Sequence, residues 1–136
     1  MRKFKKLIKK LELEKYVIFH GFKKRKDLDE LFGKSDIGIG SLGNHRKGIY
    51  KESALKNREY CARGLPFILS SKDEDFPESF KYIHYVSQDE TPIDIGKIIQ
   101  FYNNIKDYNY LKKMREYAEK HLKWEVKLRP IIDKIY

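Results

Sequence analysis

The chain has 136 residues, of which 40% are hydrophobic and 14% aromatic, a composition that suits one domain with one core and argues against intrinsic disorder. No apolar run approaches the roughly 18 residues of a membrane-spanning helix, and the single cysteine excludes an internal disulfide, so a reducing cytoplasm is the expected compartment. The net charge of +10 invites a nucleic-acid interpretation, but residues 1–35 alone hold 12 Lys and Arg against 5 Asp and Glu, and the sequence has no zinc-finger, RNA-stacking or helix-turn-helix motif.

The first predicted element is a basic amphipathic helix near the N-terminus. Phe4, Leu7, Ile8 and Leu11 recur at the spacing of one helical face, and lysines fill the other face. Two interpretations stay open: a solvated surface helix, or a helix that lies on a membrane and meets anionic lipid headgroups. Both account for the basic N-terminal segment without nucleic acid, which we do not expect as a partner.

Two strands and a helix are expected before the longest polar loop. The apolar run at 16–19 predicts a buried strand, and residues 27–33 predict a helix. Residues 37–42 predict another strand, whose two glycines indicate that something approaches its backbone closely. The loop at 43–51 follows the carboxyl end of that strand, the edge where open α/β sheets bind ligands. Three basic residues in this loop would favour an anion, namely His45, Arg46 and Lys47.

A short helix and a sharp turn follow the loop. Ser53 is a suitable N-cap, which would leave the backbone N–H groups of Ala54 and Leu55 facing the loop, where the helix dipole favours an anion. Gly64 is placed to end the helix in a left-handed conformation, and Pro66 forbids further helix.

The helix and the strand after it predict one αβ step of a parallel sheet. The apolar side of the helix is expected to consist of Leu55, Tyr60 and Cys61, with the cysteine as a small structural residue against the sheet. Residues 67–69 are continuously apolar, as expected of a strand that is covered on both faces.

One more strand and C-terminal helices complete the prediction. Residues 82–86 predict the strand, in which His84 is interpreted as structural rather than catalytic. Two amphipathic helices and an apolar tail follow. The first helix would start at Pro92, and Pro130 would kink or break the tail.

These residues resemble the carboxyl-terminal, nucleotide-sugar-binding half of the group 1 glycosyltransferases, retaining enzymes with two Rossmann-like domains. In that family a glutamate lies five residues before the glycine of a Gly-x-Pro turn, and an apolar strand follows; here these are Glu59, Gly64, Pro66 and residues 67–69. One branch of the family has Ser-Pro-Leu-Lys before the glutamate, where this chain has Ser-Ala-Leu-Lys at 53–56. The order of elements agrees from about Leu7 to the C-terminus.

The resemblance implies how a nucleotide-sugar donor is bound. Glu59 would hold the ribose, because a carboxylate accepts hydrogen bonds from two adjacent hydroxyls, and Phe22 would lie near the base. The diphosphate would lie at the start of the helix, at Ser53, Ala54, Leu55 and Lys56. Without the resemblance, Glu59 would equally suit an ion pair on a solvated face, with Arg58, Arg63 or Lys56 as its partner.

The chain departs from the family at the donor-sugar position. Many relatives carry a second glutamate eight positions before the first, where this chain has Lys51, with Glu52 beside it. These two residues are the candidates for contact with the donor sugar. In the family's strand order 3-2-1-4-5-6, the strands at 16–19 and 37–42 would be the third and the fourth, without the two strands that normally lie between them. We favour a truncated domain over a re-paired sheet or a second chain that fills the gap.

The sequence therefore predicts an α/β protein with a partial Rossmann-like parallel sheet of about four strands and C-terminal helices. Residues 1–136 would form a partial C-terminal nucleotide-sugar-binding domain. The intact enzyme would be a retaining transferase that moves a hexose to a glycan or a lipid-linked acceptor. This chain alone would have weak activity or none, because both domains position the substrates. No metal or cofactor is expected.

Two other functions stay open. One is a non-catalytic basic α/β module that binds an anionic or phosphorylated partner, and the other is an interaction domain that forms a homo-oligomer through an exposed sheet edge. The expected partners are the donor, the acceptor and the missing N-terminal domain. The protein would be cytoplasmic, and at the inner membrane face if the basic helix binds lipid.

Overall fold

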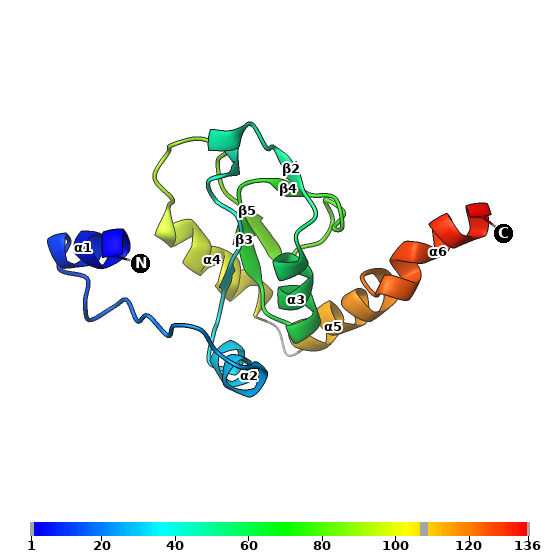
Figure 1. The fold of residues 1–136 in the computed structure, drawn as a ribbon, viewed down its shortest axis with the longest axis horizontal. Coiled ribbons are helices and arrows are strands. Elements are labelled where there is room, and N and C mark those ends of the chain that lie inside the picture. The colour runs from blue at the N-terminus through cyan, green and yellow to red at the C-terminus, as the bar shows by residue number, and fades with distance from the viewer. Residues whose placement is uncertain (1, 107–108, 136) are drawn as a thin grey trace. The chain divides into compact units, whose positions relative to one another are not determined.

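The structure is a computed structural model that describes residues 2–106 and 109–135. It consists of two compact units, Met1–Gly33 and Lys34–Tyr136. The first unit contains α1 (Arg2–Lys10) and α2 (Arg25–Gly33), which confirm the two helices expected there (Figure 1). Neither helix contains a buried residue. The apolar face of α1 is exposed to solvent, including Phe4 and Leu7.

The predicted buried strand at 16–19 is wrong. These residues form no strand, and the Ile18 side chain is 73% exposed. The backbone N–H groups of Tyr16 and Val17 both donate to the carbonyl of Leu13, which makes a turn instead. A strand requires a neighbouring strand that accepts and donates backbone hydrogen bonds, and no described segment pairs with this one.

The second unit contains three of the predicted strands, paired in one parallel sheet. Its strands are β1 (Gly38–Ile39), β3 (Phe67–Leu69) and β5 (Ile83–Tyr85), in the order β1-β3-β5. A second, two-stranded parallel sheet pairs β2 (Lys51–Glu52) with β4 (Lys72–Asp73). The mixed α/β class and the parallel pairing are therefore confirmed.

Close packing within the chain explains Gly38, which lies in β1, and Gly40, which follows directly after it. A Cβ at Gly38 would lie 2.9 Å from the Tyr60 ring, and one at Gly40 would lie 2.0 Å from Cδ2 of Leu69. The close approach that the sequence predicts is thus made by the protein's own side chains.

Helix α3 (Leu55–Arg63) connects the small sheet to β3, and its buried side differs from the predicted one. Cys61 is buried as expected, but Leu55 is 64% exposed and Asn57 is fully buried in its place. Gly64 ends the helix with φ at 74°, in the left-handed region, which confirms the predicted C-cap. The core lies between α3, β3 and the C-terminal helices and contains Cys61, Phe67, Leu69, Phe76, Phe80, Tyr82, Ile83, Ile105, Met114, Ala118 and Leu122.

Three helices follow the sheet: α4 (Ile95–Ile105), α5 (Tyr110–His121) and α6 (Trp124–Ile135). The predicted helix start at Pro92 is wrong, because α4 is capped by Asp94, whose side chain accepts from the Lys97 N–H at 3.2 Å. Of the kink or break predicted at Pro130, the break does not occur, since α6 continues past this residue. None of the described helices is long and apolar enough to cross a membrane.

Candidate functional site

The residues predicted to bind the donor sugar and the diphosphate lie where β2 leads into α3. Glu52 is held at both carboxylate oxygens, because Oε2 accepts from Asn44 Nδ2 at 2.7 Å and Oε1 accepts from Asn57 Nδ2 at 2.9 Å. Lys51 is exposed and forms an ion pair with Glu74 at 3.3 Å. Of the two donor-sugar candidates, only Glu52 has a fixed orientation.

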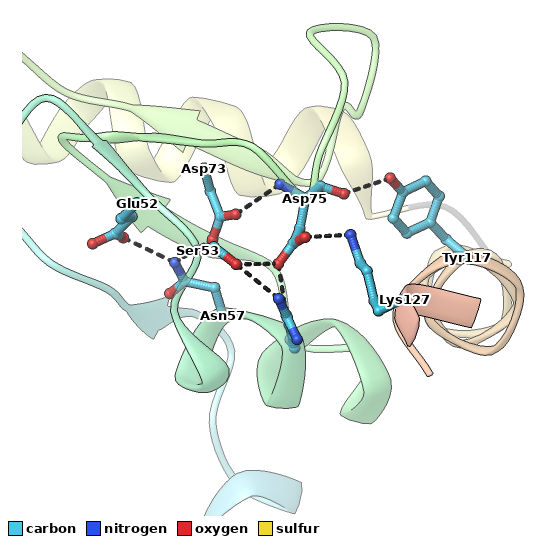
Figure 2. Close-up of polar contacts among 8 residues, drawn as sticks. Glu52, Ser53, Asn57, Asp73, Asp75, Tyr117 and Lys127 are labelled. Atoms are coloured by element: carbon cyan, nitrogen blue, oxygen red, sulfur yellow. Dashed lines mark hydrogen bonds and ion pairs between the residues drawn. The ribbon is translucent and has the colours of Figure 1, made fainter. Parts of the chain in front are cut away.

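Asn57 links Glu52 to a second carboxylate. Its Nδ2 also donates to Asp73 Oδ2 at 2.8 Å, and Figure 2 shows the amide between the two acidic side chains. Burial raises the pKa of the Asp73 carboxyl, although hydrogen bonds from Asn57 and from the backbone N–H groups of Asp75 and Ala54 oppose this shift. Asn57 was missed by the sequence analysis, because a polar residue in a charged helical segment gives no signal of burial.

The predicted N-cap at Ser53 is wrong. Ala54 occupies the N-cap position of α3, and the Ser53 hydroxyl is instead engaged with the loop after β4. It donates to Asp75 Oδ2 at 2.8 Å and accepts from Arg58 Nη2 at 2.7 Å. A nearby carboxylate thus competes successfully with the helix end for this hydroxyl.

Asp75 is the centre of this network (Figure 2). Its carboxylate accepts from Ser53, from Arg58 Nε at 2.6 Å and from the ammonium of Lys127, and its backbone carbonyl accepts from Tyr117 at 2.8 Å. Burial opposes ionisation, but the donors Lys127, Ser53 and Arg58 outweigh it and hold the pKa of Asp75 below its usual value. The network fastens α5 and α6 to the N-terminal end of α3.

One of the backbone amides at the N-terminal end of α3 already has a partner within the protein. The Ala54 N–H contributes a hydrogen bond to Asp73, so one of the two amides predicted to meet a diphosphate faces a carboxylate. Lys56 and Leu55 are exposed at the same end of the helix.

The basic loop after β1 carries less available charge than its sequence suggests. It contains a short 3₁₀ helix, η1 (Asn44–Lys47), in which His45 and Arg46 both contact Glu90. Arg46 donates to both oxygens of Glu90, at 2.7 and 2.5 Å, and His45 Nε2 lies 2.9 Å from Oε1. These contacts lower the pKa of Glu90 to about 2, with Arg46 as the main cause. Two of the three basic residues predicted to favour an anion therefore have an acidic partner.

Glu59 lies on the outer face of α3, one turn after Leu55. Its Oε1 accepts from Arg63 Nη2 at 3.1 Å and from Nε at 3.2 Å, which is the helical ion pair that the residues alone suggested. Glu59 and Leu55 line one groove of about 390 Å³, formed by α3, α5 and the start of α6. The pockets at the carboxyl ends of the strands are lined by other residues. The structure thus brings Glu59 and Leu55 together in a groove at the side of α3.

Three further candidates have simple structural settings. Phe22 lies in the first unit, and its side chain is 93% exposed. Cys61 donates to the Met114 carbonyl at 3.2 Å, and burial raises the pKa of its thiol to about 12, which suits a structural role. His84 packs on the Phe101 ring, and its pKa is lowered mainly by burial and to a smaller extent by the charge of Lys97.

Across residues 2–106 and 109–135, no group of three or more His, Cys, Asp or Glu is arranged to hold a metal ion.

Comparison with known proteins identifies one family. The model of the family "Glycosyl transferases group 1" matches residues 1–121 of the chain. No curated protein and no solved structure matches. The matched range includes both units up to the last residue of α5 and leaves α6 outside.

Proposed function

This chain belongs to the group 1 glycosyl transferases, and on that premise we propose that it binds a nucleotide diphosphate sugar. In the intact enzyme the sugar, a hexose, passes with retention of configuration to a hydroxyl of a glycan or of a lipid-linked acceptor. The proposal assigns only donor binding to these residues. Acceptor binding belongs to a second Rossmann-like domain, because transfer requires two substrates to be positioned together.

Glu59 is the proposed ribose ligand. Arg63 holds its Oε1, while Oε2 has no hydrogen-bond partner among the residues that the structure describes. A carboxylate oriented in this way accepts hydrogen bonds from two neighbouring hydroxyls. The observation that supports the proposal is that Glu59 and the first residue of α3, Leu55, line the same groove. A ligand held by Glu59 there would lie close to the end of the helix that favours an anion.

The diphosphate is proposed to lie at the N-terminal end of α3, near the Leu55 N–H and the exposed Lys56 ammonium. Asp73 already faces the Ala54 N–H, so a diphosphate there meets a carboxylate. Ser53 acts through Asp75 and Arg58 rather than on the phosphates, because its hydroxyl is engaged with both.

For the donor sugar we propose Glu52 rather than Lys51. The two amides that hold Glu52 fix its carboxylate next to the start of α3, whereas the Lys51 side chain is exposed and paired with Glu74. Phe22 stays the residue that the family resemblance places near the base.

The alternative function is a basic module that binds an anionic surface, and one observation favours it. Helix α1 contains no acidic residue, six of its nine residues are Lys or Arg, and two of its apolar residues, Phe4 and Leu7, are exposed. A helix of this kind lies on anionic lipid, with its apolar face in the headgroup region. Such contact is compatible with the transferase proposal and would bring the enzyme to a lipid-linked acceptor.

The deciding experiment is calorimetric titration of the chain with UDP and with GDP. Glu59→Gln removes the negative charge but keeps the size of the side chain, and binding should weaken at least tenfold. The control is Glu119→Gln, because Glu119 lines the same groove from α5. If the chain binds neither nucleotide, or if both variants lose affinity equally, the assignment of Glu59 is wrong.

A further inference from the structure

Resting on the proposed function, we infer that the groove beside α3 is the nucleoside subsite and that the base of the donor stacks on Trp124. Trp124 begins α6 and lies beyond the family match, so the comparison assigns it no role. Its side chain is 60% exposed, although tryptophan is among the residues that gain most from burial.

The groove has the composition of a site for a flat polar ligand. Small and apolar side chains from α3 and α5 form part of its wall, including Ala62, Ala118 and Leu122. Its volume of about 390 Å³ is within the usual range for small-molecule pockets, roughly 300–1,000 Å³. The indole of Trp124 supplies a stacking surface for which any base is suitable, at about 1–3 kcal/mol per base.

Charged residues surround this apolar surface at positions that suit the rest of a nucleotide. Glu59 contributes a carboxylate for ribose hydroxyls, and Arg115 and Lys123 add positive charge. The guanidinium of Arg58 lies 5.4 Å from the centre of the indole ring. Arg58 is in turn fixed by Asp75, so the network at the start of α3 also orients the proposed stacking surface.

This arrangement differs from the one that the family resemblance implies, in which the base lies near Phe22. The two placements are separable, because Phe22 belongs to the first unit and Trp124 to the second. They also predict different effects of single substitutions on the affinity for a nucleotide and on the affinity for pyrophosphate, which has no base.

The test uses Trp124 as its own reporter, since the chain contains one tryptophan. Titration with UDP or GDP should quench or shift its fluorescence, whereas inorganic pyrophosphate should not. In calorimetry, Trp124→Ala should weaken nucleotide binding about tenfold and leave pyrophosphate binding unchanged, and Trp124→Phe should restore most of the loss. Leu128→Ala is the matched control, because it removes an exposed apolar side chain from the same helix outside the groove.

The outcomes separate this inference from the proposed function. If nucleotides bind and Glu59→Gln abolishes binding, but the fluorescence and the affinity of Trp124→Ala are unchanged, the transferase proposal stands and the stacking role is wrong. If Phe22→Ala alone weakens binding, the base lies where the resemblance places it. If no nucleotide binds to the chain, both are wrong.

Discussion

Asn57 donates its side-chain amide to the carboxylate of Asp73 across 2.8 Å, and both side chains are fully buried. The same amide nitrogen also binds Glu52. A single neutral residue therefore holds two acidic side chains that the pairing of β2 with β4 brings directly opposite each other. Its removal would leave both carboxylates short of a donor.

We expect Asn57→Ala to lower the free energy of unfolding by about 1–3 kcal/mol, the cost of leaving a buried polar group without its partner. Urea denaturation at neutral pH measures this change. Asn103→Ala, an exposed asparagine on α4, is the control and should stay within about 0.5 kcal/mol of the original chain. Equal, small changes in both variants would show that the buried amide contributes nothing to stability.

The lowered pKa of Asp75 predicts that the folded protein loses stability in acid. Hydrogen bonds hold its pKa in the folded chain below the ordinary value of 3.8, so its contribution is fully present above that value. As the pH falls from 3.8 through the lower folded pKa, the unfolded chain takes up the proton first, and stability decreases. Asp75→Asn should therefore be less stable at neutral pH and lose less stability below this value, as measured by urea denaturation across a pH series.

Asp73 provides the comparison, because burial shifts its pKa in the opposite direction. The folded chain keeps the proton on Asp73 to a higher pH than the unfolded chain does. Stability therefore falls as the pH rises through that window, and Asp73→Asn should remove this component. Parallel stability curves for the two variants and the original chain would contradict both assignments.

The basic and apolar side chains of α1 lead us to expect that the chain binds anionic vesicles. The chain should sediment with vesicles that contain phosphatidylglycerol and not with pure phosphatidylcholine, and added salt should weaken the binding, because screening reduces the attraction of exposed charges. Charge reversal at Lys6 and Lys9 should reduce binding strongly. The same reversal at Lys112 and Lys113 on α5 changes the net charge equally and should have a smaller effect. Equal losses would indicate a general charge effect instead of a surface formed by α1.

Local patterns predicted the elements whose formation depends on neighbouring residues. Gly64 ends α3 as expected because its φ of 74° lies in the left-handed region that favours glycine. Residues 67–69 form a buried strand, as predicted from three consecutive apolar side chains after a Gly-x-Pro turn. The parallel αβ step around them followed from the same residues.

The errors arose where distant residues decide the outcome. Ser53 suits an N-cap, but Asp75, which is 22 residues away, takes its hydroxyl. Leu55 was expected in the core, yet hydrogen bonds to Glu52 and Asp73 place Asn57 there and turn the leucine outward. Residues 16–19 have the composition of a strand without a partner to pair with, and no local pattern reveals that absence.

The contacts of Glu90 connect the segment after β1 to the segment after β5, and the paired side chains of Arg46 and Glu90 are exposed to solvent. A carboxylate with a pKa of about 2 stays ionised through any physiological acidification, so moderate acid leaves this tie in place. Concentrated electrolyte acts differently, since mobile ions compete directly for an exposed pair. High salt should therefore weaken the connection between the segments that follow β1 and β5, whereas moderate acid should leave it intact.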